Sequence, residues 1–227
     1  MKGIDISRWQ DGIDFNAVRA AGYDFVILKA GGSDDGFYTD QCFESFYDRA
    51  LAAGLYIGAY YFVGPEFTSV EDGRADAERF IRILGNRLFE MPVFVDIECT
   101  RPADKDGVTE AAIAFCETME EAGYYVGIYA SEYSGFRDRL DAKRLTNYTW
   151  WVAAWGDDEP DIPYGIWQYN NNGRVGDVTV DENEAAEEFR AVIAAGGYNN
   201  YSGRRRIAER LTIIRDEIAA LIDYVER

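Results

Sequence analysis

The sequence predicts an α/β fold: an irregular, TIM-like β/α barrel of eight strands with few helices in its last third, followed by a C-terminal helix. Apolar, strand-like runs alternate with amphipathic stretches as far as residue 130, and strand-like runs then follow one another with little helix between them. Alternating strands and helices imply parallel strands. Eight such strands suggest a sheet that closes into a barrel.

Local signals mark the elements of the first two thirds of the chain. Asp14 and Thr68 begin patterns typical of helix starts, because their side chains accept hydrogen bonds from free backbone N–H groups. Three helical patterns end at an Ala-Gly pair, at Gly22, Gly54 and Gly123, and glycine is the usual residue just beyond a helix. Strands are expected at residues 3–7, 24–30, 55–62, 92–98 and 124–130, and helices at residues 15–21, 40–53, 69–84 and 109–122.

The last third of the barrel is depleted in helices. Strands are expected at residues 148–154, 164–169 and 178–181, and a helix at residues 184–195. The barrel domain therefore spans residues 1–196. Residues 197–203 are rich in Asn, Tyr, Ser and Gly and are expected to form a linker.

Residues 204–227 form an amphipathic helical pattern. Its apolar residues recur at steps of four and three: Ile207, Leu211, Ile214, Ile218, Leu221 and Val225. This heptad spacing predicts a seam for self-association, so a homo-oligomer is one expectation. A helix folded back on the barrel and a stub leading to a further module are the alternatives.

Composition excludes several classes of protein. The chain has 227 residues, no histidine and a net charge of −18. Without histidine it cannot build a Ser-His-Asp triad, a Cys-His dyad or a histidine metal site. The acidic charge argues against nucleic-acid partners. The sequence has no run of 18 apolar residues, so no membrane span is expected. Cofactor fingerprints are missing, so no cofactor is expected.

Two acids, Asp96 and Glu98, end the apolar run that starts at Met91. Side chains two apart on a strand point to one face, with Cα atoms roughly 6.5 Å apart. Two carboxyl groups facing one cleft can cleave a glycosidic bond, one donating a proton and the other stabilising positive charge. The alternative is a pair of structural acids that cap a helix or bridge to arginines.

Barrel closure brings two further acids to the same rim. Asp5 lies on the first expected strand and Asp181 on the eighth, and closure makes these strands neighbours. Active sites of such barrels lie at the C-terminal ends of the strands. Like charges gathered there disfavour full ionisation, so at least one of the acids should have a raised pKa.

Several aromatic residues fall near this rim and could stack on sugar rings, namely Trp9, Tyr60, Phe62, Tyr129, Trp155 and Tyr169. Many aromatic side chains serve only as core, which is the alternative for each. Lys29 is expected to form an ion pair with a neighbouring acid. The loop 31–36 lacks the spaced ligands of a calcium loop and is expected to be an ordinary turn, so no metal site is predicted.

Three segments together resemble the family 25 glycoside hydrolases, the Chalaropsis-type lysozymes. They are Gly3-Ile4-Asp5-Ile6-Ser7-Arg8-Trp9-Gln10, Val95-Asp96-Ile97-Glu98, and Trp167-Gln168-Tyr169 with Val180-Asp181-Glu182-Asn183. The resemblance covers about residues 1–195. It implies a modified β/α barrel that cleaves the β-1,4 bond after N-acetylmuramic acid in bacterial peptidoglycan with retention of configuration.

The resemblance also implies roles for individual residues. Glu98 would be the general acid/base, and Asp96 either the nucleophile or the residue that orients the substrate acetamido group. Asp5 and Asp181 would line the cleft. The family usually has an apolar residue in place of Glu182, which strand alternation should turn away from Asp181.

The expected function is therefore that of a peptidoglycan muramidase acting on the cell wall, with a catalytically inactive wall-binding module as the alternative. A chitinase-type barrel fits less well, since the longer acid motif of those enzymes is absent. The N-terminal residues lack the apolar core of a signal peptide, and the three cysteines, an odd number without a CxxC pattern, are expected to be free thiols. Both features fit a phage endolysin held in the host cytoplasm until a holin releases it. A secreted lysozyme is the other expectation.

Overall fold

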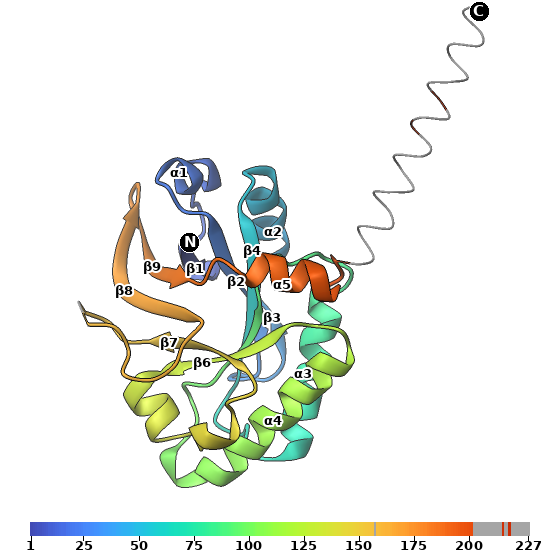
Figure 1. Ribbon diagram of the computed structural model, residues 1–227, viewed down its shortest axis with the longest axis vertical. Helices are drawn as coiled ribbons and strands as arrows, with labels where there is room; N and C mark the ends of the chain where they lie inside the picture. The colour runs from blue at the N-terminus through green and yellow to red at the C-terminus, as the bar shows by residue number, and fades with distance from the viewer. Residues whose placement is uncertain (157, 202–214, 216–217, 219–227) are drawn as a thin grey trace, which may run out of the picture.

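The strands form one sheet that closes on itself into a barrel (Figure 1). The computed structural model describes residues 1–156, 158–201, 215 and 218. The strands are β1 (Lys2–Ile6), β2 (Phe25–Gly32), β3 (Tyr38–Thr39), β4 (Tyr56–Phe62), β5 (Val93–Asp96), β6 (Val126–Ser131), β7 (Thr149–Ala153), β8 (Ile166–Val175) and β9 (Val178–Ala185). Their order is β1-β9-β8-β7-β6-β5-β4-β2-β3, and β1 also pairs with β2. Because β3 is a two-residue attachment to β2, eight strands make the closed wall, as predicted.

Helices cover one part of the barrel wall. They are α1 (Phe15–Ala20), α2 (Phe43–Ala52), α3 (Val70–Leu84), α4 (Lys105–Glu121) and α5 (Phe189–Gly196), with short turns η1 (Arg8–Gln10), η2 (Pro102–Asp104), η3 (Glu132–Arg137) and η4 (Ala142–Arg144). Asp14 caps α1 as predicted, accepting a hydrogen bond from the backbone of Asn16. The α3 cap is Ser69, one residue beyond the expected Thr68. Between α4 and α5 the described residues contain no helix longer than the turns η3 and η4, so loops make most of the connections there, which confirms the irregular last third.

Strand β9 is antiparallel to both of its neighbours, so the expectation of an all-parallel barrel is wrong at this position. Only Gly176 and Asp177 separate β8 from β9, and two residues can join antiparallel strands but cannot make a parallel crossover. Gly176 adopts a positive φ of 59°, which favours glycine. The helix expected at 184–195 begins only at Phe189, because β9 continues to Ala185.

Two apolar layers hold the barrel together. Alternate residues of β2 show the division: Val26 and Leu28 pack outward with the helices, whereas Phe25 and Ile27 face the barrel interior. Inside the barrel, the ring centroid of Trp151 lies 4.4 Å from that of Tyr129. Further aromatic rings pack on Trp151 from β4 and β5. This interior stack fills the barrel, so a substrate can reach only its ends.

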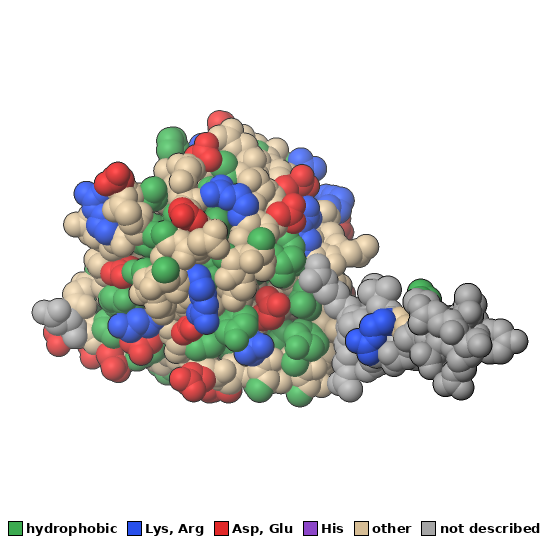
Figure 2. Space-filling model, turned by 90° about the horizontal axis from the view of Figure 1, so that it is seen from above, with side chains coloured by type: hydrophobic (Ala, Val, Ile, Leu, Met, Phe, Trp, Pro, Cys, Tyr) green, Lys and Arg blue, Asp and Glu red, His purple; other side chains and the backbone are tan. Residues whose placement is uncertain are grey.

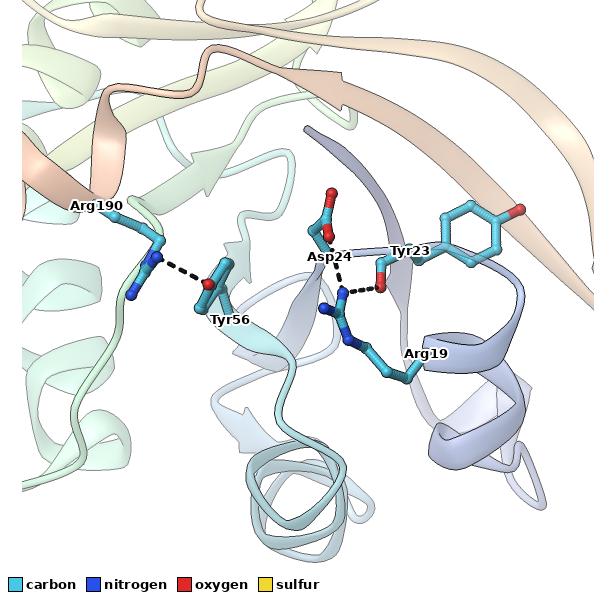
Figure 3. Close-up of polar contacts among 5 residues, drawn as sticks. All are labelled: Arg19, Tyr23, Asp24, Tyr56 and Arg190. Atoms are coloured by element: carbon cyan, nitrogen blue, oxygen red, sulfur yellow. Dashed lines mark hydrogen bonds and ion pairs between the residues drawn. The ribbon is translucent and has the colours of Figure 1, made fainter.

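Helix α5 crosses the end of the barrel at which the parallel strands begin. Figure 3 shows the contact that holds it: Arg190 donates a hydrogen bond of 2.8 Å to the hydroxyl of Tyr56 at the start of β4. The guanidinium also lies 3.7 Å from the centre of the Tyr56 ring. Beside it, Arg19 forms an ion pair with Asp24. The opposite end of the barrel is left for the site.

The linker expected at 197–203 is contradicted for the residues around Asn199, which are part of the barrel base. Asn199 is fully buried, and its side chain bonds the backbone of Tyr125 at 2.8 Å and of Met91 at 3.0 Å. Asn199 and Asn200 both have positive φ, a conformation that asparagine tolerates better than other residues with side chains. The polar composition of this segment is typical of loops, and for that reason the sequence predicts a linker where the structure has a packed segment. The folded unit therefore extends beyond Gly196.

Most of the predicted C-terminal helix, 204–227, lies outside the described residues, so its self-association stays a prediction. No helix among the described residues has the length and apolarity needed to cross a membrane. Figure 2 shows acidic and basic side chains interspersed with apolar ones on the face that it presents.

Candidate active site

Four acids meet at the C-terminal end of the barrel strands, as predicted. Asp5 lies on β1, and its register partner on β9 is Asp181. Asp181 reaches the rim through this antiparallel pairing and not as the end of a parallel strand. Glu98 follows β5 and faces the same cleft, which has a volume of about 380 Å³. Of the predicted site residues, the cleft is lined by Asp5, Trp9, Tyr60, Phe62, Glu98 and Asp181.

The predicted catalytic pair differs in exposure. Asp96 is the last residue of β5 and is 4% exposed, whereas Glu98 reaches solvent. The backbone N–H of Ile97 still bonds the carbonyl of Tyr129, at 3.0 Å, so the extended chain continues past the strand end. Among the described residues, Asp96 Oδ1 has no hydrogen-bond partner. A buried oxygen without a hydrogen-bond partner is costly, and a catalytic role is one reason for a protein to keep it.

Burial and repulsion by neighbouring acids raise the pKa values of this pair, with Glu98 acting on Asp96 and Asp181 acting on Glu98. The pKa of Asp96 is well above its usual value, first because of burial and then because of the charge on Glu98. The pKa of Glu98 is also raised, mainly because the cleft walls remove part of its solvent. The charge on Lys29 opposes both shifts. A carboxyl group that keeps its proton toward neutral pH can act as a general acid.

Asp5 is the third acid with a strongly altered environment. Its Oδ2 accepts hydrogen bonds from Gln168 Nε2 at 2.9 Å and Asn183 Nδ2 at 2.8 Å. Burial and then the neighbouring Asp181 raise the pKa of Asp5 to about 7, although the two amide donors lower it. Because both amides donate to Oδ2, Oδ1 is the oxygen that is left to carry a proton when Asp5 is protonated. Gln168 and Asn183 lay within the recognised motifs, but sequence reasoning gave neither a role.

Lys29 does not form the predicted ion pair within the described part of the chain. Its ammonium group instead lies 3.9 Å from the centre of the Phe62 ring and 5.9 Å from that of Tyr60. An ammonium over an aromatic face is attracted by the electrons of the ring. Lys29 therefore influences the acids through space and holds two aromatic walls of the cleft in place.

The other predicted aromatics divide into two groups. Tyr129 lies below the cleft and donates a hydrogen bond of 3.0 Å to Gln168, and the indole N–H of Trp155 donates to the same amide oxygen at 3.0 Å. Trp155 is 60% exposed and lines a neighbouring hollow of about 680 Å³. Tyr169 was expected near the rim but is not among the residues that line the cleft. Strand alternation turns it away from the buried Gln168, and its ring packs on Trp167.

One wall of the cleft was missed by sequence reasoning. Arg8, Asp34 and Tyr38 line it, and the Tyr38 hydroxyl donates a hydrogen bond of 2.7 Å to Asp34. The loop 31–36 was expected to be an ordinary turn, yet it brings Asp34 to the cleft. The missed signal was a polar loop directly after the second strand, where barrel active sites are built. Within the described residues, no three His, Cys, Asp or Glu side chains are grouped as metal ligands would be.

Glu182 is turned away from Asp181, as strand alternation predicted. Its carboxylate accepts hydrogen bonds from the hydroxyl of Tyr23 and from Asn170 Nδ2, the latter at 2.5 Å. Tyr23 follows α1, so these contacts connect the outer face of the β8–β9 hairpin to the first helix. Glu182 therefore has a structural role outside the cleft.

Comparisons with known proteins agree with this geometry. The family described as "Glycosyl hydrolases family 25" matches residues 4–178. The chain is 30% identical over 200 residues to "Autolytic lysozyme" of Clostridium acetobutylicum, covering 87% of this chain and 58% of the relative. It is 29% identical over 208 residues to "Lysozyme M1" of Streptomyces globisporus, covering 80% and 65%.

A solved structure extends the comparison. The crystal structure of the bacterial lysozyme from Streptomyces coelicolor is 26% identical, with a TM-score of 0.72, and the match covers 88% of this chain and 98% of that one. The chain spans about three fifths of the length of the two curated relatives. With the family match extending over most of the chain, the protein belongs to family 25 of the glycosyl hydrolases.

Proposed function

We propose that this protein is an N-acetylmuramidase, a lysozyme that hydrolyses the β-1,4 bond between N-acetylmuramic acid and N-acetylglucosamine in bacterial peptidoglycan. The observation that carries this proposal is the exposed Glu98 on the cleft with the buried Asp96 two residues before it, whose pKa the charge on Glu98 raises, in a chain similar to two lysozymes. An intact pair also argues against an inactive wall-binding module, which has no need of a proton donor.

In the proposed mechanism, Glu98 gives its proton to the glycosidic oxygen as the bond to the sugar C1 breaks. Its raised pKa keeps that proton available. The acetamido oxygen of the same sugar then bonds C1 from the opposite face. Glu98, now ionised, takes a proton from water, which attacks C1 and releases the acetamido oxygen. Two displacements at C1 give overall retention of configuration.

Asp96 fits the task of orienting the acetamido group better than that of attacking C1. Asp96 is buried, whereas Glu98 lines the cleft, and Asp96 Oδ1 has no hydrogen-bond partner among the described residues; in this proposal that oxygen accepts the acetamido N–H of the bound sugar. A hydrogen bond to the charged form of Asp96 would lower its raised pKa. The ionised carboxylate would then stabilise positive charge on the acetamido group.

The remaining cleft residues are assigned to substrate binding. Asp5 and Asp181 would accept hydrogen bonds from sugar hydroxyls, while Trp9, Tyr60 and Phe62 present apolar faces to the sugar rings. Tyr129 and Trp155 would act through Gln168. Tyr169 is not included, because it lies outside the cleft.

The proposed partner is the peptidoglycan of the cell wall, reached by holin-mediated release from the host cytoplasm or by secretion. We also propose that residues 204–227 join copies of the chain. Nucleic acid, membrane and cofactors have no place in this proposal.

The test is mass spectrometry of peptidoglycan digested by the protein, with Glu98→Gln as the control. Products with N-acetylmuramic acid at the new reducing end support the proposal. Products ending in N-acetylglucosamine would contradict it, as would an unchanged pattern of products with the Glu98→Gln protein. The absence of any cleavage by the unmodified protein would favour the inactive module.

A further inference from the structure

The wall of the cleft that sequence reasoning missed carries alternating cationic and aromatic side chains. The guanidinium of Arg8 lies 4.9 Å from the centre of the Trp9 ring and 6.0 Å from that of Tyr38. The Lys29 ammonium lies 5.7 Å from the centre of the same Tyr38 ring and 3.9 Å from that of Phe62. Arg8 is thus held over aromatic faces at the mouth of the cleft.

The backbone that carries Arg8 is fixed from three sides. Ser7 caps the turn η1, and the side chain of Gln10 accepts a hydrogen bond of 3.0 Å from the Ser7 backbone. The Arg8 N–H donates to the buried Asp40 at 3.1 Å. Gln10 also donates to the carbonyl of Thr179, two residues before Asp181, at 3.4 Å. The position of Arg8 relative to the acids is therefore set by the fold.

The two cations of this wall serve different purposes. Lys29 lowers the pKa values of Asp96 and Glu98, so its charge is used by the catalytic acids. Within the described residues, no carboxylate lies within ion-pair distance of Arg8. In a chain with a net charge of −18, a fixed arginine at the mouth of an acidic cleft without an acidic partner is suited to an anion from outside.

We propose that Arg8 binds a carboxylate carried by the muramic acid residue of the substrate, on its lactyl ether or on the stem peptide attached to that ether. This inference rests on the proposed muramidase function and deepens it by naming the group that is recognised. The sugar rings themselves are neutral, so the muramic acid substituent is the source of negative charge in such a glycan. A guanidinium matches a carboxylate with two parallel hydrogen bonds.

The charge on the protein makes this local contact necessary. An acidic protein and an anionic wall repel each other, but at physiological salt the repulsion is screened over about 8 Å. Arg8 acts inside that distance, directly at the substrate. The stacking of Arg8 on Trp9 would also place the carboxylate beside a ring that faces a sugar.

The test measures binding, so that it does not depend on cleavage. Arg8→Gln is made in the Glu98→Gln protein, and both proteins are titrated calorimetrically with three tetrasaccharide fragments of peptidoglycan. One fragment has stem peptides with free carboxylates, the second has fully amidated stems, and the third has no stems and carries free lactyl carboxylates. The matched control is Arg74→Gln, which removes an exposed arginine of α3.

We expect Arg8→Gln to raise the Kd about five-fold for a fragment with a recognised carboxylate, which is the upper range for an exposed ion pair. For the amidated fragment the Kd should rise less than about two-fold. The effect should disappear in about 1 M salt, where the screening length falls to about 3 Å. Arg8→Lys should recover part of the affinity. Arg74→Gln should change none of the three values.

The outcomes separate the two sources of the carboxylate. Weaker binding of the free-stem fragment alone assigns the stem peptide, and weaker binding of the stem-free fragment assigns the lactyl group; both support the proposal. Equal weakening of all three fragments would show that Arg8 only positions Trp9 and would overturn it, as would no change in any Kd. Because cleavage is not measured, failure of the muramidase proposal would show separately in the digestion products.

Discussion

Replacing Asp5 by Asn should stabilise the fold above neutral pH. Asn has the same shape, and its carbonyl oxygen can take the place of Oδ2, which accepts both amide donors, from Gln168 and Asn183. The Asn amide group then takes the place of Oδ1 on a residue that lines the cleft. The substitution thus removes a buried acid and keeps both amide donors, Gln168 and Asn183, paired.

The magnitude follows from the pKa of Asp5, which rises from 3.8 to about 7 in the folded protein. Between these values the folded state holds a proton that the unfolded chain has released, so the stability of the parent falls as pH rises through this range. A shift of about three units corresponds to about 4 kcal/mol. Since Asp181 shares part of the repulsion, we expect Asp5→Asn to gain about 2–4 kcal/mol at pH 8 and almost nothing near pH 4.

The assay is urea unfolding followed by tryptophan fluorescence at several pH values between about 4 and 8.5. The control is Asp48→Asn, which removes an exposed acid from α2 and should give a difference that stays flat with pH. The free energy of unfolding of Asp5→Asn minus that of the parent should grow as pH rises. A difference that stays constant with pH, or that shrinks as pH rises, would refute the reasoning.

Four further outcomes are expected. Glu98→Gln should lower wall lysis by about 10²–10⁴-fold in a protein that still unfolds cooperatively, because the amide cannot donate the proton; activity within a few-fold of the parent would contradict its role. Since desolvation raises the pKa of Glu98, lysis should peak on the acidic side of neutral and survive EDTA, and an optimum above about pH 9 would count against this. A chain ending after Tyr201 should keep its activity on a soluble fragment but lose self-association in light scattering, and an unchanged mass would remove the association claim. Asn199→Ala should lower the free energy of unfolding by about 2–4 kcal/mol in a urea titration, because it leaves buried backbone groups unpaired; a loss below about 0.5 kcal/mol would show that the segment is a linker after all.

Sequence patterns predicted the barrel but not the direction of its last strand. Helix-ending glycines such as Gly123 and helix starts such as Asp14 act through local backbone geometry, so the sequence reveals them. The β8–β9 hairpin is different, because its turn lies within Asn170–Asp177, a polar stretch with weak strand propensity. Its pairing depends on contacts with β1 from the other end of the chain, which no local pattern records.

The candidate site shows the same division. Asp96 and Glu98 were predictable because two acids ending an apolar strand are locally anomalous. Asp181 was placed correctly but for another reason, since its antiparallel register with Asp5 brings it to the cleft. Arg8 and Tyr38 were missed because their importance comes from contacts between η1 and β3, two short elements that lie far apart in the sequence. Exposed cationic and aromatic residues are too common on surfaces to attract notice in a sequence.

The position of β9 between β1 and β8 gives the protein a built-in order of assembly. While the chain is being synthesised, β1 has only β2 as a neighbour until residues near Ala185 leave the ribosome, and the base stays open until Asn199 arrives. The Asp5–Asp181 pair can form only at that stage. Long-range pairing of this kind is slow and leaves strand edges exposed in the nascent chain. A partly synthesised copy therefore lacks the complete cleft, and the proposed hydrolytic activity would report on the intact barrel.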